Sequence, residues 1–189
     1  LKHATSAAHL ALEATTLMRA VSSGVPSREV YVSYLVCQWR VHVGLEAMLA
    51  TQLPSSWTSG RLLKATWLEA DLQALKQPLP QVPASVPWVS NLAQAVGVMY
   101  VLEGATLGLG VVTRRLAPSH PALAGAGRYM AAYGSRTGSR WSEFQRMLAT
   151  VDRAEWPSAC IAANATFSMF QQAFDTAEID ERAVVGDVL

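Results

Sequence analysis

Charged residues are scarce in this chain, and neither sign dominates. Only 15% of the 189 residues are charged, and 15 basic residues against 14 acidic ones give a formal net charge of +1 at pH 7. This balance argues against nucleic acid or an anionic membrane surface as a partner. Because 51% of the residues are hydrophobic, we expect a globular protein with a buried core. The length fits one domain, 1–189, with a loosely held tail after about residue 179.

Cysteine and histidine are also rare, and their spacing excludes several kinds of site. Cys37 and Cys160 lie far apart without a CxxC pattern, and the opening segment is amphipathic rather than signal-like, so we expect free thiols and a cytoplasmic protein. His3 and His9 would lie on different faces of one helix and cannot ligate one metal ion together. HExxH, GxSxG, P-loop and dinucleotide-binding motifs are missing. A bound metal would therefore have one histidine ligand, which favours haem.

Alternating strand patterns are missing as well, whereas helical periodicity dominates. A proline-rich connection is expected over 78–87 and a break over 133–139. The helices are expected over about 1–13, 28–53, 58–77, 90–116, 140–151 and 158–178, with a short one ending near 133. The sequence therefore predicts an all-α fold.

Three glycines share one face of the most apolar of these helices. Gly97, Gly104 and Gly108 are seven and then four residues apart, a spacing that stacks them on one side of a helix. Each costs roughly 1 kcal/mol of helix stability relative to alanine. Either a second helix packs closely against this face, or a flat molecule approaches its backbone. The spacing leaves both explanations open.

The same apolar segment raises the question of a membrane span. Its longest run, 96–112, is slightly shorter than a span requires. Glu103 lies near its centre, where a carboxylate would be costly in a bilayer. We therefore expect no membrane partner.

Two segments together resemble the haem oxygenase family. The opening LKHATSAAHLALE is similar to the family's first helix, which begins Leu-Lys-x-Ala-Thr-x-x-x-His. YVLEGATLGLGVVTRRL resembles the glycine-rich distal helix, especially in the bacterial branch linked to phytochromes, and GSRTGSRWSEFQRML is similar to a later basic and aromatic helix. The resemblance implies a multi-helix bundle with haem between the first helix and a kinked glycine-rich helix.

The resemblance also assigns roles to residues of this chain. His9 is expected to be the axial ligand of the haem iron. Gly104 and Gly108 are expected to let the distal backbone lie close to the porphyrin and to border a water network there. The propionates are assigned to three basic residues, Lys2, Arg136 and Arg140.

The implied reaction uses haem b as both cofactor and substrate. O2 and electrons from an external donor open the ring to biliverdin, CO and ferrous iron. A ferredoxin or a flavin reductase is the expected donor. A bacteriophytochrome is the expected acceptor of the biliverdin.

Ala105 departs from the animal-type family pattern, which has an aspartate at this position to order water. An alanine side chain can neither donate nor accept a hydrogen bond, so water held by the Gly104 carbonyl, by Thr106 or by Arg114 would have to substitute. Two alternatives stay open. One is a haem carrier on the same fold without catalysis. The other is a thiaminase-like helical enzyme without haem, although Cys37 and Cys160 show no acid–base partner in the sequence.

Overall fold

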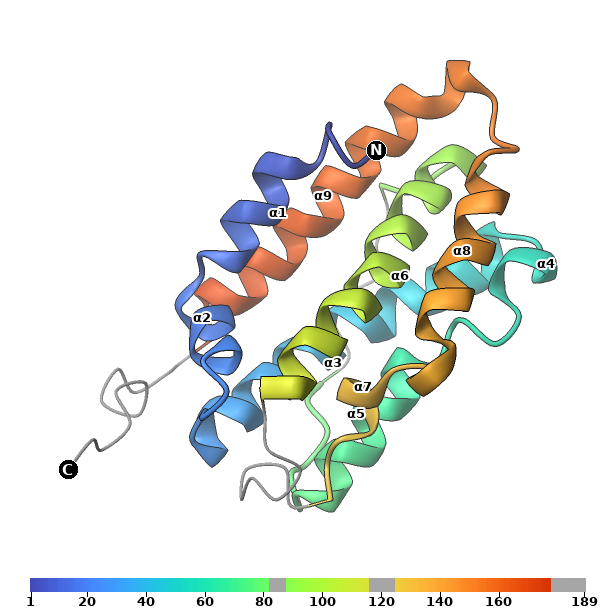
Figure 1. The fold of residues 1–189 in the computed structure, drawn as a ribbon. Helices are drawn as coiled ribbons and strands as arrows, with labels where there is room; N and C mark the ends of the chain where they lie inside the picture. Colours follow the sequence, from blue (N-terminus) through green and yellow to red (C-terminus); the bar gives the residue numbers. More distant parts are fainter. Residues whose placement is uncertain (82–87, 116–124, 178–189) are drawn as a thin grey trace.

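The computed structural model describes residues 1–81, 88–115 and 125–177, all of which form helices and connecting turns (Figure 1). The tail expected after residue 179 and most of the second half of the proline-rich connection lie outside these ranges. The helices are α1 (Ser6–Glu13), α2 (Thr16–Ser22), α3 (Arg28–Gln52), α4 (Ser55–Thr58), α5 (Lys64–Ala74), α6 (Leu92–Arg115), α7 (Arg128–Ala131), α8 (Thr137–Leu148) and α9 (Trp156–Asp175), with 3-10 turns η1 (Gly134–Arg136) and η2 (Arg153–Glu155). The all-α prediction is confirmed.

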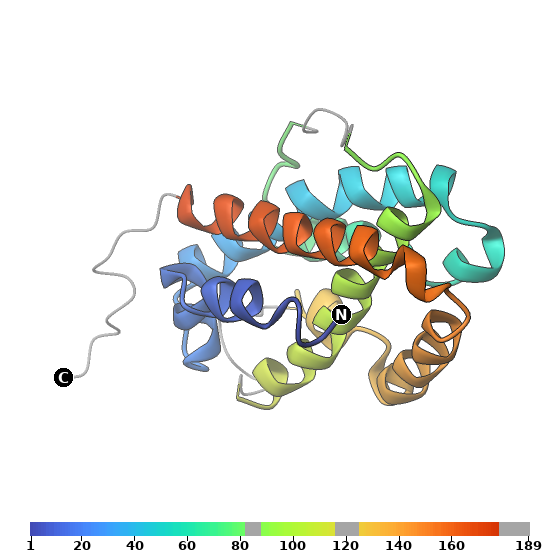
Figure 2. The same ribbon diagram turned by 90° about the horizontal axis from the view of Figure 1, so that it is seen from above.

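Helix α9 is the central packing element of the bundle. It packs along α6 and also contacts α1, α2 and α3. Seen from above, α1 and the second half of α6 lie on the same side of α9 (Figure 2), whereas in Figure 1 the two helices flank α9. The fold therefore places the histidine-bearing helix and the glycine-bearing helix on one side of the molecule.

Apolar side chains from α3, α6, α8 and α9 form the core beneath this side. Fully buried members include Leu45, Leu49, Met99, Leu102 and Phe144. Burial of each such side chain contributes roughly 1.5–3 kcal/mol. A second apolar cluster joins α2, α3, α5 and α7 with the end of α6 and the end of α9.

Several helix boundaries agree with the sequence because their signals are local. Ser27 caps α3, since its Oγ accepts a hydrogen bond from the Val30 N–H at 3.2 Å. Pro54 follows the end of that helix, and Pro157 lies in the first turn of α9. The expected start of the next helix at 140 is wrong, because α8 begins at Thr137, directly after the turn η1.

The expected start of the third helix at residue 58 or 59 is wrong. A separate short helix, α4, occupies 55–58, and α5 begins only at Lys64. The Glu46 carboxylate of α3 accepts the N–H groups of Lys64 at 2.8 Å and Ala65 at 3.2 Å. A side chain from another helix therefore supplies the cap that no residue near the start of α5 provides.

Helix α6 remains helical across its glycines. Its segment Leu92–Gly110 is long and apolar enough to cross a membrane by length and composition, but 61% of its most apolar window is buried inside the molecule. Burial of this extent is typical of a core helix in a folded bundle.

Candidate functional site

His9 lies on the outer side of α1 and is accessible to a ligand. Its side chain is 54% exposed. Its ring packs in a T-shaped arrangement with the Phe167 ring of α9, with 5.6 Å between the ring centroids. Glu13, one turn later, places a carboxylate oxygen 3.6 Å from Nδ1. Histidines that bind metals usually direct the other ring nitrogen toward a carboxylate or carbonyl. The arrangement therefore leaves Nε2 as the nitrogen available to a haem iron.

The three glycines of α6 have three different surroundings. A Cβ on Gly97 would lie 2.1 Å from the carbonyl oxygen of Ala159 in α9, so this glycine permits close packing of two helices. A Cβ on Gly104 would meet the Trp141 ring at 3.8 Å, which is ordinary contact. A Cβ on Gly108 would find no atom of the described residues within 4 Å. The backbone at Gly108 is therefore open to a flat ligand, whereas Gly97 is covered by α9.

A buried polar cluster lies behind the open part of α6. We call it the Glu103 cluster, and it consists of Arg61, Lys64, Glu103 and Tyr133. Glu103 is 1% exposed and forms ion pairs with the Arg61 guanidinium and the Lys64 ammonium. The Tyr133 hydroxyl donates to the same carboxylate at 2.8 Å. Glu103 is therefore buried and paired with an arginine and a lysine, and its carboxylate does not face solvent.

Burial shifts the titration of this cluster. It lowers the pKa of Lys64, while the charges of Glu103 and Glu46 act in the opposite direction. Burial also raises the pKa of Tyr133, and the neighbouring Glu103 carboxylate raises it further. The phenol therefore stays protonated and serves as a hydrogen-bond donor.

His42 is a packed core residue of α3. Its Nε2 lies 3.1 Å from the Tyr129 hydroxyl, and its ring centroid lies 5.4 Å from that of Phe170. Nδ1 has no hydrogen-bond partner among the residues that the structure describes. Burial, and to a smaller extent Lys64, lower the pKa of His42 to about 3, so the ring is neutral at pH 7. The ring of His42 is thus closed to a ligand from solvent, whereas the side chain of His9 is exposed.

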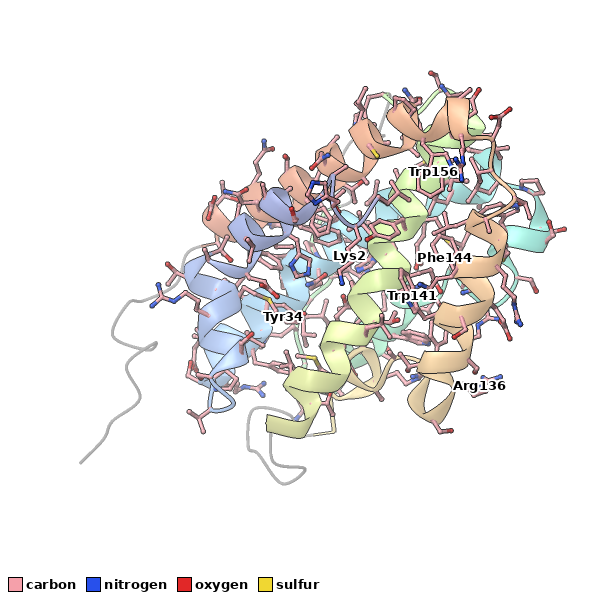
Figure 3. The ribbon with its side chains drawn as sticks, turned by 45° about the horizontal axis from the view of Figure 1, so that its top comes forward. Lys2, Tyr34, Arg136, Trp141, Phe144 and Trp156 are labelled. Carbon is pink, nitrogen blue, oxygen red and sulfur yellow. The ribbon has the colours of Figure 1, made fainter. Side chains whose placement is uncertain are left out.

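The basic residues assigned to the propionates do not all lie near His9. Lys2 is exposed and lies on the α1 side of α6, whereas Arg136 lies at the outer end of α8, beyond α6 (Figure 3). Arg140 donates to the Ser59 carbonyl at 2.8 Å and pairs with Glu143 at 3.3 Å. Both arginines line a cavity of about 480 Å³ whose lining includes neither His9 nor the glycines of α6.

Neither cysteine has the surroundings of a catalytic nucleophile in the described structure. Cys37 and Cys160 are both free, and the buried Cys37 thiol donates to the Ala173 carbonyl at 3.1 Å. Burial raises the pKa of Cys37 to about 11, whereas a nucleophilic cysteine needs a lowered pKa. Within the described ranges no group of three or more potential metal-ligating side chains occurs. These observations disfavour the thiaminase-like alternative and agree with a site built on one histidine.

The sequence analysis missed three of the four members of the Glu103 cluster. Arg61 and Lys64 fell in a segment without a motif, and Tyr133 fell in an expected break. The available signal was Glu103 itself, because a carboxylate inside an apolar helix needs a partner when it is buried. Its partners lie 30 to 42 residues away in the chain, so their identity required the tertiary structure.

Comparison with known proteins agrees with this geometry. The family model described as "Heme oxygenase" matches residues 1–176. The chain belongs to the haem oxygenase family. A protein named "Heme oxygenase" from Xanthomonas campestris pv. campestris is 33% identical over 137 residues, which cover 70% of this chain and 79% of that protein.

A solved haem oxygenase shows the same fold. The NO- and CO-bound heme oxygenase from Neisseria meningitidis matches with a TM-score of 0.71, covering 92% of this chain and 87% of that one. At 19% sequence identity, this match bears on the fold alone. The haem oxygenase resemblance and the expected fold class are both confirmed.

Proposed function

We propose that this member of the haem oxygenase family binds haem b between α1 and the second half of α6 and opens it to biliverdin, CO and ferrous iron. The observation that carries the proposal is the pairing of an exposed His9 on α1 with an open Gly108 backbone on α6, two helices that lie on the same side of α9 when seen from above (Figure 2). When bound, haem supplies the iron that activates O2 and the ring that is opened. The protein supplies binding, orientation and exclusion of water.

The residues of α1 hold and orient the haem. His9 would hold the haem iron through Nε2, with the Glu13 carboxylate 3.6 Å from the other ring nitrogen, Nδ1. Lys2 lies on the same side and provides a cation for a propionate. The assignment of Arg136 and Arg140 to the propionates rests on the family resemblance, since their cavity lies away from His9.

The residues of α6 cover the opposite face of the haem. Gly104 and Gly108 present backbone without side chains, so the helix can lie close to the ring. Ala105 offers no polar side chain. The buried Thr106 hydroxyl donates to the Glu103 carbonyl at 2.6 Å, so its proton is held inside the helix. Of the groups expected to order water on this face, the Gly104 carbonyl therefore stays a candidate, and the side chain of Arg114 lies outside the described part of the structure.

The reaction also needs partners beyond this chain. We propose a ferredoxin or a flavin reductase as the electron donor, because ring opening consumes electrons that the protein does not hold. A bacteriophytochrome is the proposed acceptor of the biliverdin, and the cytoplasm is the proposed compartment. We also propose that 1–189 form one domain, because the family match spans 1–176.

A hemin titration followed by turnover tests the function. Hemin should give a histidine-ligated Soret spectrum at one equivalent, and a reductant with O2 should then yield biliverdin, CO and free ferrous iron. A stable complex that yields no biliverdin would support the alternative of a haem carrier, which the non-polar Ala105 favours. No hemin binding would reject both functions.

A further inference from the structure

We propose that the Glu103 cluster positions the second half of α6 over the haem, and that Lys64 is its central positioning residue. The inference rests on the proposed function, because it concerns the helix that would cover the haem. It adds a role for residues that contact neither His9 nor the glycines in the described structure.

The Lys64 ammonium donates all its hydrogen bonds within the Glu103 cluster. It carries three N–H donors, and it has three acceptors: the Arg61 carbonyl at 2.6 Å, the Tyr133 hydroxyl at 2.9 Å and the Glu103 carboxylate. Its side chain is 1% exposed. A buried ammonium with each hydrogen directed at an acceptor fixes the positions of all three partners.

The main chain of Lys64 is fixed as well. The Glu46 carboxylate of α3 accepts its N–H, and that of Ala65, at the first turn of α5. Lys64 thus links three helices: α3 through its backbone, α5 as its own helix, and α6 through Glu103. The Tyr133 hydroxyl accepts from Lys64 and donates to Glu103, which adds the chain after α7 to the same point.

The end of α6 also packs into the apolar core through Leu109 and Val112, but the glycine face of the helix has few contacts. Among the residues that the structure describes, none lies within 4 Å of a Cβ placed on Gly108, and a Cβ on Gly104 meets the ring of Trp141 at 3.8 Å. Glu103 directly precedes Gly104 and is anchored by two cations and a phenol. The distance between the glycine backbone and a flat ligand therefore depends on where the cluster holds Glu103.

Lys64→Met and Tyr133→Phe test this role, with Asp71→Asn as the matched control. Asp71 is also buried and also fixes another helix, because its carboxylate accepts the N–H groups of Arg128 and Tyr129 at 2.8 Å, but it forms no hydrogen bond with α6. Hemin affinity is measured by Soret titration. Amide hydrogen exchange of α6 is measured on the haem-free protein, and urea unfolding reports global stability.

We expect Lys64→Met to weaken hemin binding at least about tenfold, because small displacements of a positioned group reduce its function strongly. Exchange should rise in 103–115 more than in 92–102 before haem is added. Tyr133→Phe keeps the ring and removes one hydrogen bond, so it should give a smaller change of the same kind and serves where Lys64→Met does not fold. Asp71→Asn should reduce global stability while hemin affinity changes less than about twofold.

The outcomes separate this inference from the proposed function. Equal losses of hemin affinity at matched stability in the Lys64, Tyr133 and Asp71 variants would overturn the positioning role alone. Uniform exchange along α6 in Tyr133→Phe, with hemin affinity unchanged, would also overturn it. Failure of the unmodified chain to bind hemin would overturn the proposed function and this inference together.

Discussion

The two halves of α6 carry the same residue type on one helix and use it in opposite ways. In 92–102, Gly97 lies against the backbone of α9, and the neighbouring residues Val96, Val98 and Met99 are buried in an apolar core. In 103–115, Gly108 faces open space, and Glu103 anchors the helix through buried charges. The first half is packed against α9 on its glycine face, whereas the second half is held from behind by ion pairs and by the buried Leu109 and Val112, and its glycine face stays uncovered.

This difference shows that a glycine stripe has no single meaning. Packing against α9 makes the first half rigid through many small contacts. The second half must leave space for a ligand, so its anchoring comes from behind. The predictions below begin with the change expected to have the largest effect on this comparison.

Gly97→Ala should be the most damaging single substitution in α6. Its Cβ would lie 2.1 Å from the Ala159 carbonyl oxygen, and neither backbone can yield cheaply. We expect a loss of about 3 kcal/mol or more in the free energy of unfolding, at or above the upper range for overpacking. Urea denaturation measures it. A loss below about 1 kcal/mol would show that α6 and α9 can separate, and would remove the basis of the comparison.

His9→Ala should leave the fold intact and remove the haem ligand. The side chain is 54% exposed, so we expect little change in unfolding. Hemin affinity should fall at least about 100-fold, with loss of the histidine-ligated Soret spectrum, because removal of a ligand exceeds the loss of its supporting contacts. His3→Ala, an exposed histidine six residues earlier, is the control. An unchanged spectrum in His9→Ala would point to a different ligand.

The free energy of unfolding should decrease in acid because of His42, which is buried in the core of the bundle. Its folded pKa of about 3 lies below the ordinary value of 6.5, so between these values the unfolded state binds more protons. The contribution of the neutral His42 to the free energy of unfolding is therefore complete above pH 6.5. It decreases as the pH drops, by up to about 1.4 kcal/mol per pH unit. His42→Phe should show a flatter dependence when urea unfolding is compared at pH 7, 6, 5 and 4. Parallel curves for the two proteins would contradict the assignment.

Gly108→Val should separate ligand binding from folding. The branched side chain would enter the open space beside the backbone, where nothing in the described structure lies within 4 Å of a Cβ. We expect hemin affinity to fall about tenfold while stability changes by less than about 1 kcal/mol. Soret titration and urea unfolding on the same preparation measure the two effects. Loss of stability without loss of affinity would mean that another helix covers Gly108.

Gly108→Ala should have the smallest effect and the opposite sign from Gly97→Ala. Alanine is the better helix former, and its Cβ meets no atom here, so we expect the haem-free protein to gain about 0.5–1 kcal/mol. The midpoint of urea unfolding checks the gain. Destabilisation at this position would erase the contrast between the two halves of α6.

The local parts of the fold followed from the sequence because their causes are local. Ser27 caps α3 three residues ahead, and Pro157 lies in the first turn of α9. The start of α5 could not be predicted this way, since its cap comes from Glu46, 18 residues earlier in another helix. His9 was identified through its motif, whereas its contact with Phe167 depends on the docking of α1 on α9.

The sequence by itself determined an all-α chain of the haem oxygenase family, a histidine on its first helix and a glycine-rich helix with one carboxylate. Periodicity and motifs are properties of neighbouring residues, so they survive without a three-dimensional structure. The tertiary structure alone decided that Gly97 meets α9 while Gly108 stays open, and that Glu103 meets Lys64 and Arg61. These contacts join residues from distant parts of the chain, and only the packing of the helices brings them together.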